Sequence, residues 1–397
     1  MMERLLADRD TVAAVRRVRQ GDDLAEGIAR AAWSVIAEPG DTVAGALIES
    51  LGAMEALSLA LESSALPAPA EGGSEPAARA LSEARARWRP RARPGDVRDA
   101  LCRARDADAR LIVPGDELWP TALDDLGPAR PSALWVRGDP GLLVRTPRVA
   151  IVGARAATGY GEHVAAELAG DLAASGAVIV SGGAYGIDGV AHRAALGVEG
   201  ATVAFLAGGV DRAYPMGHQS LLQHIAAEGA LVSEPPCGTA PTKWRFLARN
   251  RLIAALGHAT VVVEAGWRSG SLNTAGHAAT LGRPLGAVPG PVTSAASAGC
   301  HRLLREYDAQ CVTSPAEVRE LWGQSAAAPP EGTAHDPDRV RLLDAMSARS
   351  RRSVDELARR SGLAPGRVLA LLGLLELEGE VDVEETGWRH LAASSPR

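Results

Sequence analysis

Lysine is almost absent from this chain of 397 residues, since Lys243 is the only lysine among 42 lysine and arginine residues. A GC-rich genome, which favours arginine and alanine codons, accounts for most of this bias. The position of the single lysine is therefore informative. The formal net charge is -6, so the chain has no overall basic field, and a nucleic-acid site would have to be a local patch.

Cysteine and long apolar runs are scarce as well. The four cysteines lie far apart and form no Cys-x-x-Cys pair, which argues against a zinc site or a disulfide framework. No apolar run approaches the roughly 20 residues that a membrane helix needs. The first ten residues include acids where a signal peptide needs an apolar core. We therefore expect a protein of the reducing cytoplasm, with no membrane segment and no metal.

The first part of the chain, residues 1–105, is rich in Ala, Arg, Leu and Glu and predicts a helical N-terminal domain. Its expected elements are amphipathic helices at 10–18 and 24–30, a helix that starts at Asp41–Thr42, a loop at 67–76 and a helix at 77–89. This region shows no motif that carries chemistry.

Residues 106–323 change to apolar runs that alternate with helical segments. A short strand is expected at 134–138, and further strands at 148–152, 177–181, 201–206, 230–233, 260–264 and 285–288. The helices between them are expected at 161–175, 187–196, 219–228 and 249–256. Strands that are apolar on both faces and alternate with helices predict an α/β fold with a doubly wound, mostly parallel sheet. Such sheets bind ligands beyond the carboxyl ends of their strands, at the switch point.

The last part of the chain predicts a separate small module. Residues 324–338 have the composition of a linker, and 339–397 predict a winged helix. Ser353 and Glu356 form a capping box at the start of its second helix. A third helix is expected at 366–378, followed by a two-stranded wing.

Three Gly-rich turns follow predicted strands. The first holds Gly153 and Arg155, the second Ser181, Gly182 and Gly183, and the third Ser269, Gly270 and Ser271. Turns of this kind present backbone N–H groups at the start of a helix, where phosphate binds. An arginine within such a turn can grip phosphate with two hydrogen bonds. The alternative is that these are ordinary strand–helix loops with a surface arginine.

The first turn departs from the common nucleotide-binding motifs. The string 159–164 lacks the third glycine of the dinucleotide fingerprint, and no Walker lysine follows, so NAD and ATP are not indicated and no cofactor is expected. Asp188 and His192 lie one helical turn apart, and we interpret them as structural rather than as metal ligands. Glu264 and Asp211 are too isolated to assign as an acid–base pair, and no catalytic residue is expected.

The stretch 243–251 is the most informative motif. Its cations are Lys243, Arg245, Arg249 and Arg251. Trp244 lies between the first two cations, Phe246 follows Arg245, and Asn250 lies between the last two. Proteins hold single-stranded nucleic acid with cations that follow the phosphates and aromatic rings on which bases stack. The alternative is that Phe246, one of only two phenylalanines, fills the core while the arginines are solvated.

Together these motifs resemble the DprA/Smf family of DNA-processing proteins. The resemblance rests on Val152–Arg155, Val180–Asp188, Gly208–Gly209, Tyr214–Pro215, Ser233–Glu234, Phe246–Arg251, Glu264–Ser271 and Ala287–Gly290, in that order. It implies a Rossmann-like fold with a SAM-like helical region before it and a winged helix after it. It also implies a homodimer without catalytic activity that binds and protects single-stranded DNA in natural transformation and loads the RecA recombinase.

The resemblance carries contacts with DNA to matching positions of this chain. They are Gly153, Arg155, Ser181, Gly182, Gly183, Lys243, Phe246, Arg249, Asn250, Arg251, Ser269, Gly270 and Ser271. Tyr185 stands where many relatives have a basic residue, so one phosphate contact is expected to be either weaker or replaced by stacking. Leu247 stands where proline is common. The acidic end of the chain favours contact with a protein over contact with DNA.

Two alternatives stay open at this point. One is a nucleotide-processing enzyme of the lysine-decarboxylase-like phosphoribohydrolase group, which has a related fold. The Pro-Gly-Gly-x-Gly-Thr string of that group is absent here. The other is binding of duplex DNA through the C-terminal module.

Overall fold

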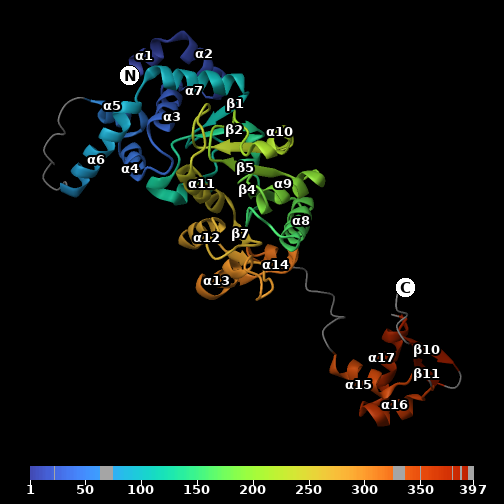
Figure 1. Cartoon of the computed structure of the whole chain (residues 1–397). Helices are drawn as coiled ribbons and strands as arrows, with labels where there is room; N and C mark the ends of the chain where they lie inside the picture. The colour runs from blue at the N-terminus through green and yellow to red at the C-terminus, as the bar shows by residue number, and fades with distance from the viewer. Residues whose placement is uncertain are drawn as a thin grey trace. The chain divides into compact units, whose positions relative to one another are not determined.

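The computed structural model describes residues 1–21, 23–62, 75–324, 336–348, 350–377, 379–384 and 387–391. It divides into two compact units, Met1–Gln324 and Ser325–Arg397 (Figure 1). Most of the loop predicted at 67–76 and of the linker predicted at 324–338 lies outside the described residues. Among the helices that are described, none is both long enough and apolar enough to cross a membrane.

A nine-stranded sheet forms the centre of the first unit, in the order β1-β2-β6-β5-β4-β3-β7-β8-β9. The strands are β1 (Ala109–Ile112), β2 (Leu134–Gly138), β3 (Arg148–Val152), β4 (Val178–Ser181), β5 (Thr202–Leu206), β6 (Ala230–Ser233), β7 (Ala259–Val262), β8 (Leu285–Ala287) and β9 (Gln310–Cys311). All neighbours from β6 to β9 are parallel, and β1 and β2 join antiparallel at one edge. The predicted doubly wound, mostly parallel sheet is confirmed.

The order of the strands identifies the switch point. From β3 the chain adds β4, β5 and β6 on one side, and it then returns to place β7, β8 and β9 on the other side. The carboxyl ends of β3 and β7 therefore lie side by side, with their following loops diverging to opposite halves of the sheet. A crevice for a ligand is expected at this point.

Helices cover both faces of the sheet because successive residues of each buried strand point to opposite sides. Val149 and Ile151 of β3 pack in one cluster with α8 (Gly159–Ala174), α9 (Ile187–Gly197) and α14 (Pro315–Glu320). Ala150 and Val152 pack in another with α11 (Lys243–Leu256), α12 (Ser271–Thr280) and α13 (Ala298–Glu306). The helix α10 (Gln219–Glu228) contacts β5 and β6, and it follows the short η4 (Met216–His218).

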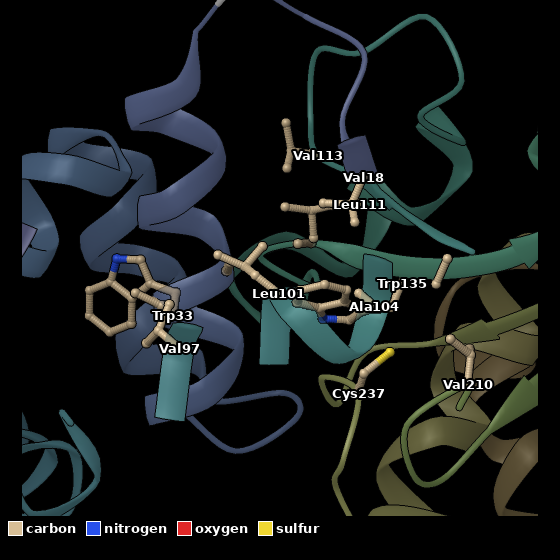
Figure 2. Close-up of a cluster of buried hydrophobic side chains, with 14 of the residues drawn as sticks. Val18, Trp33, Val97, Leu101, Ala104, Leu111, Val113, Trp135, Val210 and Cys237 are labelled. Atoms are coloured by element: carbon tan, nitrogen blue, oxygen red, sulfur yellow. The ribbon is translucent and has the colours of Figure 1, made fainter. Parts of the chain in front are cut away.

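The N-terminal helices belong to the same compact unit as the sheet. They are α1 (Met2–Ala7), α2 (Arg9–Val18), α3 (Leu24–Ile36), α4 (Thr42–Leu51), α5 (Ala53–Leu61), α6 (Glu75–Trp88), η1 (Arg89–Arg91) and α7 (Pro94–Asp106), followed by η2 (Thr121–Ala129) and η3 (Pro140–Leu143). Figure 2 shows Leu101 and Ala104 of α7 beside Trp135 of β2 in their shared core. The indole of Trp135 also donates a hydrogen bond of 3.3 Å to Ser34 Oγ of α3. The domain boundary expected near residue 105 stays a prediction.

The second unit contains α15 (Pro337–Ala345), α16 (Val354–Ser361), α17 (Pro365–Leu377) and a hairpin of β10 (Val381–Glu384) and β11 (Gly387–His390). Ser353 caps α16 by accepting a hydrogen bond of 3.3 Å from the backbone N–H of Glu356. Gly362 ends this helix at φ 71°, a conformation that glycine adopts without strain. The predicted three helices and two-stranded wing are confirmed.

Candidate nucleic-acid interface

The loops that follow β3 and β7 are fastened together at the switch point. The backbone N–H of Ala154 donates a 2.7 Å hydrogen bond to the carbonyl of Glu264, and the N–H of Ile187 donates a 3.2 Å bond to the carbonyl of Ala154. A Cβ at Gly153 would lie 2.5 Å from Ile187 Cγ1 and 2.9 Å from the Glu264 carbonyl. Glycine is therefore required for three chain segments to meet at this point.

A cleft of about 720 Å³ opens above these loops. This volume falls within the range of about 300–1,000 Å³ that is usual for sites holding organic ligands. The cleft brings together most of the residues predicted from the sequence, namely Gly153, Arg155, Lys243, Phe246, Arg249, Asn250, Ser269, Gly270 and Ser271. The first and third Gly-rich turns and the basic stretch thus line one site.

The helix α11 explains how one stretch of sequence serves the cleft. It begins at Lys243, six residues before the predicted start, because Thr242 Oγ1 accepts a 3.3 Å hydrogen bond from the backbone N–H of Arg245. Lys243, Phe246, Asn250 and Ile253 all line the cleft. Their spacing of three, four and three residues places them on one face of a helix.

Three cations on the cleft wall have no carboxylate partner among the described residues. Within the ranges that the structure describes, the side chains of Arg155, Lys243 and Arg268 line the cleft and form no ion pair or hydrogen bond with another protein group. The guanidinium of Arg155 lies 5.0 Å from the centre of the Phe246 ring. These cations can bind an anionic ligand directly, because no internal ion pair has to be broken first.

Phe246 lies among these charges rather than in the core. Its ring centre is 5.6 Å from that of Tyr214, and the guanidinium of Arg249 lies 5.9 Å away on the cleft side of α11. The side chain is partly buried, whereas Phe205, the other phenylalanine, is completely buried. A partly open ring between cations is the arrangement on which a base can stack.

Arg249 forms the floor of the cleft. Its side chain is buried, and Nη1 donates a 3.1 Å hydrogen bond to the carbonyl of Phe205. Burial lowers the pKa of Arg249 to about 10, and the neighbouring Asp188 opposes this effect. A Cβ at Gly182 would lie 1.5 Å from Nη1, so glycine makes room for the guanidinium.

Ser181, Gly182 and Gly183 of the second Gly-rich turn do not line the cleft, contrary to their prediction, although Ala184 of the same turn does. Ser181 is completely buried, and its hydroxyl donates a 2.6 Å hydrogen bond to the carbonyl of Ile151. Gly183 is buried too, and its carbonyl lies 3.1 Å from Nδ1 of His218. Together with Gly182 these residues support the cleft from below.

Arg251 lies outside the cleft, contrary to its prediction as a DNA contact. It is buried, forms a 2.7 Å ion pair with Glu234 and donates a 3.0 Å hydrogen bond to the carbonyl of Ala129. Arg245 also leaves the cleft and forms two hydrogen bonds of 2.9 and 3.0 Å with the carboxylate of Glu38. Arg245 thus attaches α11 to the N-terminal helical region, and Arg251 attaches it to the end of η2 and to the residue that follows β6.

The third turn places the start of α12 on the cleft. Ser269 Oγ and Ser271 Oγ lie 2.8 Å apart, and no side chain caps the helix at Gly270. Asn250 Nδ2 donates to the carbonyl of Gly270 at 3.4 Å and to Asn273 Oδ1 at 3.2 Å, which ties α11 to α12. The backbone N–H groups of Ser271, Leu272 and Asn273 donate within the turn, to Ser269 Oγ at 3.4 Å, to the Ser269 carbonyl at 3.2 Å and to the Gly270 carbonyl at 3.1 Å. The helix therefore offers the cleft the positive end of its dipole rather than free N–H groups.

Among the cleft residues that the sequence did not predict as DNA contacts, Tyr214 contributes an aromatic ring and Arg268 a positive charge. Arg268 immediately precedes the third turn, so its place in the chain was a usable signal. Tyr214 belongs to a motif that the resemblance includes, but nothing in the sequence indicates that its loop reaches Phe246. Tyr185 does not line the cleft and instead packs against His218 with ring centres 4.7 Å apart.

The interpretation of Asp188 and His192 as structural residues is supported by their partners. Asp188 Oδ2 accepts a hydrogen bond of 3.4 Å from the backbone N–H of Ala184. His192 Nδ1 lies 2.7 Å from Thr202 Oγ1, and burial lowers the pKa of His192 to about 3. Over the described ranges, no three His, Cys, Asp or Glu side chains gather as a metal site.

The isolated carboxylates also have structural partners. Glu264 is buried and accepts hydrogen bonds of 2.8 Å from the backbone N–H and the hydroxyl of Thr158. Asp211 accepts two bonds of 2.9 Å from the backbone N–H of Gly238. Each carboxylate thus secures a loop.

The comparison with known families assigns the chain to a family. The family model for DNA recombination-mediator protein A matches residues 110–323, and the DprA winged helix domain matches residues 325–385. The chain belongs to the DprA/Smf family. The recognition made from the sequence motifs is therefore confirmed, and the chain has a DNA-processing role related to recombination.

Individual relatives cover about three quarters of the chain. A DNA processing protein DprA of Mycobacterium tuberculosis is 48% identical over 304 residues, which are 72% of this chain and 78% of that protein. Protein Smf of Escherichia coli is 35% identical over 308 residues, 74% of this chain and 81% of the relative. The crystal structure of DprA from Streptococcus pneumoniae superposes with a TM-score of 0.59 at 28% identity, over 74% of this chain and 96% of that one.

Proposed function

We propose that this chain binds single-stranded DNA without sequence preference in the cleft at the switch point. The single observation that carries this proposal is the set of unpaired cations around a partly open aromatic ring. Arg155, Lys243 and Arg268 offer charge to phosphates, and Phe246 offers its ring to a base. Charge and stacking both recognise any base, so they give affinity without reading the sequence.

The same arrangement favours an unpaired strand over a duplex. In a duplex the faces of the bases are covered by their stacked neighbours, so Phe246 has no ring to contact. An unpaired strand can rotate a base onto the ring while its phosphates follow the cations on either side. The start of α12 at Ser271 adds the positive end of a helix dipole, which favours a further phosphate.

We also propose that the chain acts as a binding protein rather than an enzyme. Glu264 and Asp211 are engaged by backbone and hydroxyl donors. Asp188 is the carboxylate that lines the described cleft, and burial raises its pKa, with the charge of Arg249 opposing. Incubation with nucleoside monophosphates is expected to release no free base. Release of base would favour the phosphoribohydrolase alternative instead.

Membership of the family supports the wider role. We propose that the chain works in the cytoplasm as a homodimer, protects single strands during natural transformation or recombination, and loads RecA onto them. Light scattering is expected to give twice the mass of one chain. RecA filament formation on strands coated with a single-strand-binding protein is expected to accelerate when this protein is added.

The proposed function is tested by a gel shift that compares a single strand with a duplex of the same length over a range of salt. We expect tighter binding of the single strand, and a logarithm of affinity that falls with the logarithm of salt by about 0.7 per phosphate contact. Three unpaired cations predict a slope of about -2 or steeper. Equal or tighter binding of the duplex, or an affinity that does not change with the salt concentration, would contradict the proposal.

A further inference from the structure

Tyr214 is an aromatic residue of the cleft, and the binding of phosphates by the cations gives it no role. It lines the cleft beside Phe246, and 49% of its surface is open to solvent. The two ring centres lie 5.6 Å apart with their planes tilted by 53°. An open ring that already contacts a second ring at the wall of a cationic cleft extends the surface on which bases can stack.

The loop that carries Tyr214 is braced by another tyrosine. The hydroxyl of Tyr185 accepts a hydrogen bond of 3.2 Å from the backbone N–H of Gly217. The Tyr185 ring also packs edge-on against His218, whose Nδ1 lies 3.1 Å from the carbonyl of Gly183. The loop is therefore fixed three and four residues after Tyr214 to the turn that supports the cleft.

Gly217 makes this brace possible. A Cβ at this position would lie 2.5 Å from the Tyr185 hydroxyl and 3.1 Å from its ring, so any other residue would displace the tyrosine from this position. The close approach holds the loop before any ligand arrives. A side chain that is already in place loses less conformational freedom on binding, so its contacts contribute more of their energy to affinity.

We propose that Tyr214 is a second base-stacking side chain of this site, and that Tyr185 is a positioning residue that holds it beside Phe246. This inference rests on the proposed binding of single-stranded DNA. A base clamped between two rings needs about 7 Å, twice the usual carbon–carbon contact of about 3.5 Å. At 5.6 Å the two rings cannot clamp one base, and they form a continuous surface for neighbouring bases of one strand.

The test separates contacts with bases from contacts with phosphates. Affinity is measured for oligo-dT and for an abasic strand of the same length, which keeps the phosphates and lacks the rings. Tyr214→Leu is expected to weaken binding of oligo-dT by about 5- to 150-fold, the range for loss of one stacked base. Affinity for the abasic strand and the salt slope are expected to stay unchanged, because no charge is removed.

Two further variants test the brace and the place of the ring. Tyr214→Phe keeps the ring and is expected to bind oligo-dT like the wild type. Tyr185→Phe removes only the hydroxyl that holds Gly217, and it is expected to weaken binding of oligo-dT less than Tyr214→Leu while leaving the abasic strand unaffected. Trp244→Ala is the matched control, since Trp244 is 61% exposed on α11 but does not line the cleft.

The outcomes distinguish this inference from the proposed function. If the wild type binds neither strand, the proposed function fails. If the wild type binds oligo-dT and Tyr214→Leu binds it equally well, the stacking role is wrong and the proposed function stands. Equal losses on both strands for Tyr214→Leu or Tyr185→Phe would show a general structural effect and would overturn the inference.

Discussion

The two faces of α11 carry similar side chains but have different partners. On one face Lys243 and Phe246 line the cleft, and no ion pair with Lys243 occurs among the described residues. The rest of the helix, here called the paired face, carries Arg245, which is paired with Glu38, and Arg251, which is paired with Glu234. The comparison teaches that a basic stretch is not one binding surface. The carboxylates of Glu38 and Glu234 determine which cations of α11 remain available for DNA.

The largest effect that this comparison predicts is on stability, at the paired face. Arg251→Ala would leave Glu234 buried and unpaired, since the two side chains are only 6% and 9% exposed. We expect a loss of about 3–5 kcal/mol in the free energy of unfolding, measured by urea denaturation. Lys243→Ala is the control on the other face and should change stability little. A loss below about 0.5 kcal/mol for Arg251→Ala would mean that this pair does not hold the fold.

The next effect is on binding, at the open face. Phe246→Ala is expected to weaken binding of oligo-dT by about 1–3 kcal/mol, because one base loses its stacking partner. Fluorescence anisotropy measures the affinity, and a thermal melt of the same sample shows whether the fold is kept. An unchanged affinity in a folded variant would favour the alternative that Phe246 only fills space.

A smaller effect depends on pH and again belongs to the paired face. Burial alone would raise the pKa of Glu38, but hydrogen bonds and charges from Arg245 and Arg91 outweigh it and lower this pKa below 4.5. The pair therefore stabilises the fold above about pH 4.5, and this contribution is lost as the pH falls through the lowered pKa.

Arg245→Ala should accordingly remove part of the loss of stability between pH 5 and pH 3. Because Glu38 is 39% exposed, we expect a change of only about 0.2–1 kcal/mol at pH 7. Urea denaturation at several pH values measures it. A variant with the same pH profile as the wild type would show that Arg245 does not stabilise the Glu38 carboxylate.

Much of the sheet and part of the site could be predicted from the sequence. The predicted bounds of β3 and β6 agree with the structure at every residue, because buried parallel strands are continuous apolar runs bounded by glycine or polar residues. The switch point followed from that alternation, and Gly153, Arg155 and Ser269–Ser271 follow strands that end there. Local sequence thus carries the information for these elements.

The roles of Arg245, Arg251 and the second turn could not be predicted in this way. The partner of Arg245 lies 207 residues earlier in the chain, and the Arg251 guanidinium contacts Ala129, 122 residues earlier. No local pattern reports such pairings. The strand β1 was missed because a strand of four residues at the edge of the sheet gives little periodic signal.

The most direct test of the central claim is the salt dependence of single-strand binding for variants of the two kinds of cation. Removing both Arg155 and Lys243, as Arg155→Ala with Lys243→Ala, should make the slope of log affinity against log salt shallower by about 1.4, or about 0.7 for each phosphate contact. Arg245→Ala should leave the slope as in the wild type. An unchanged slope in the double variant, or an equal change in Arg245→Ala, would contradict the division of charge between the two faces of α11.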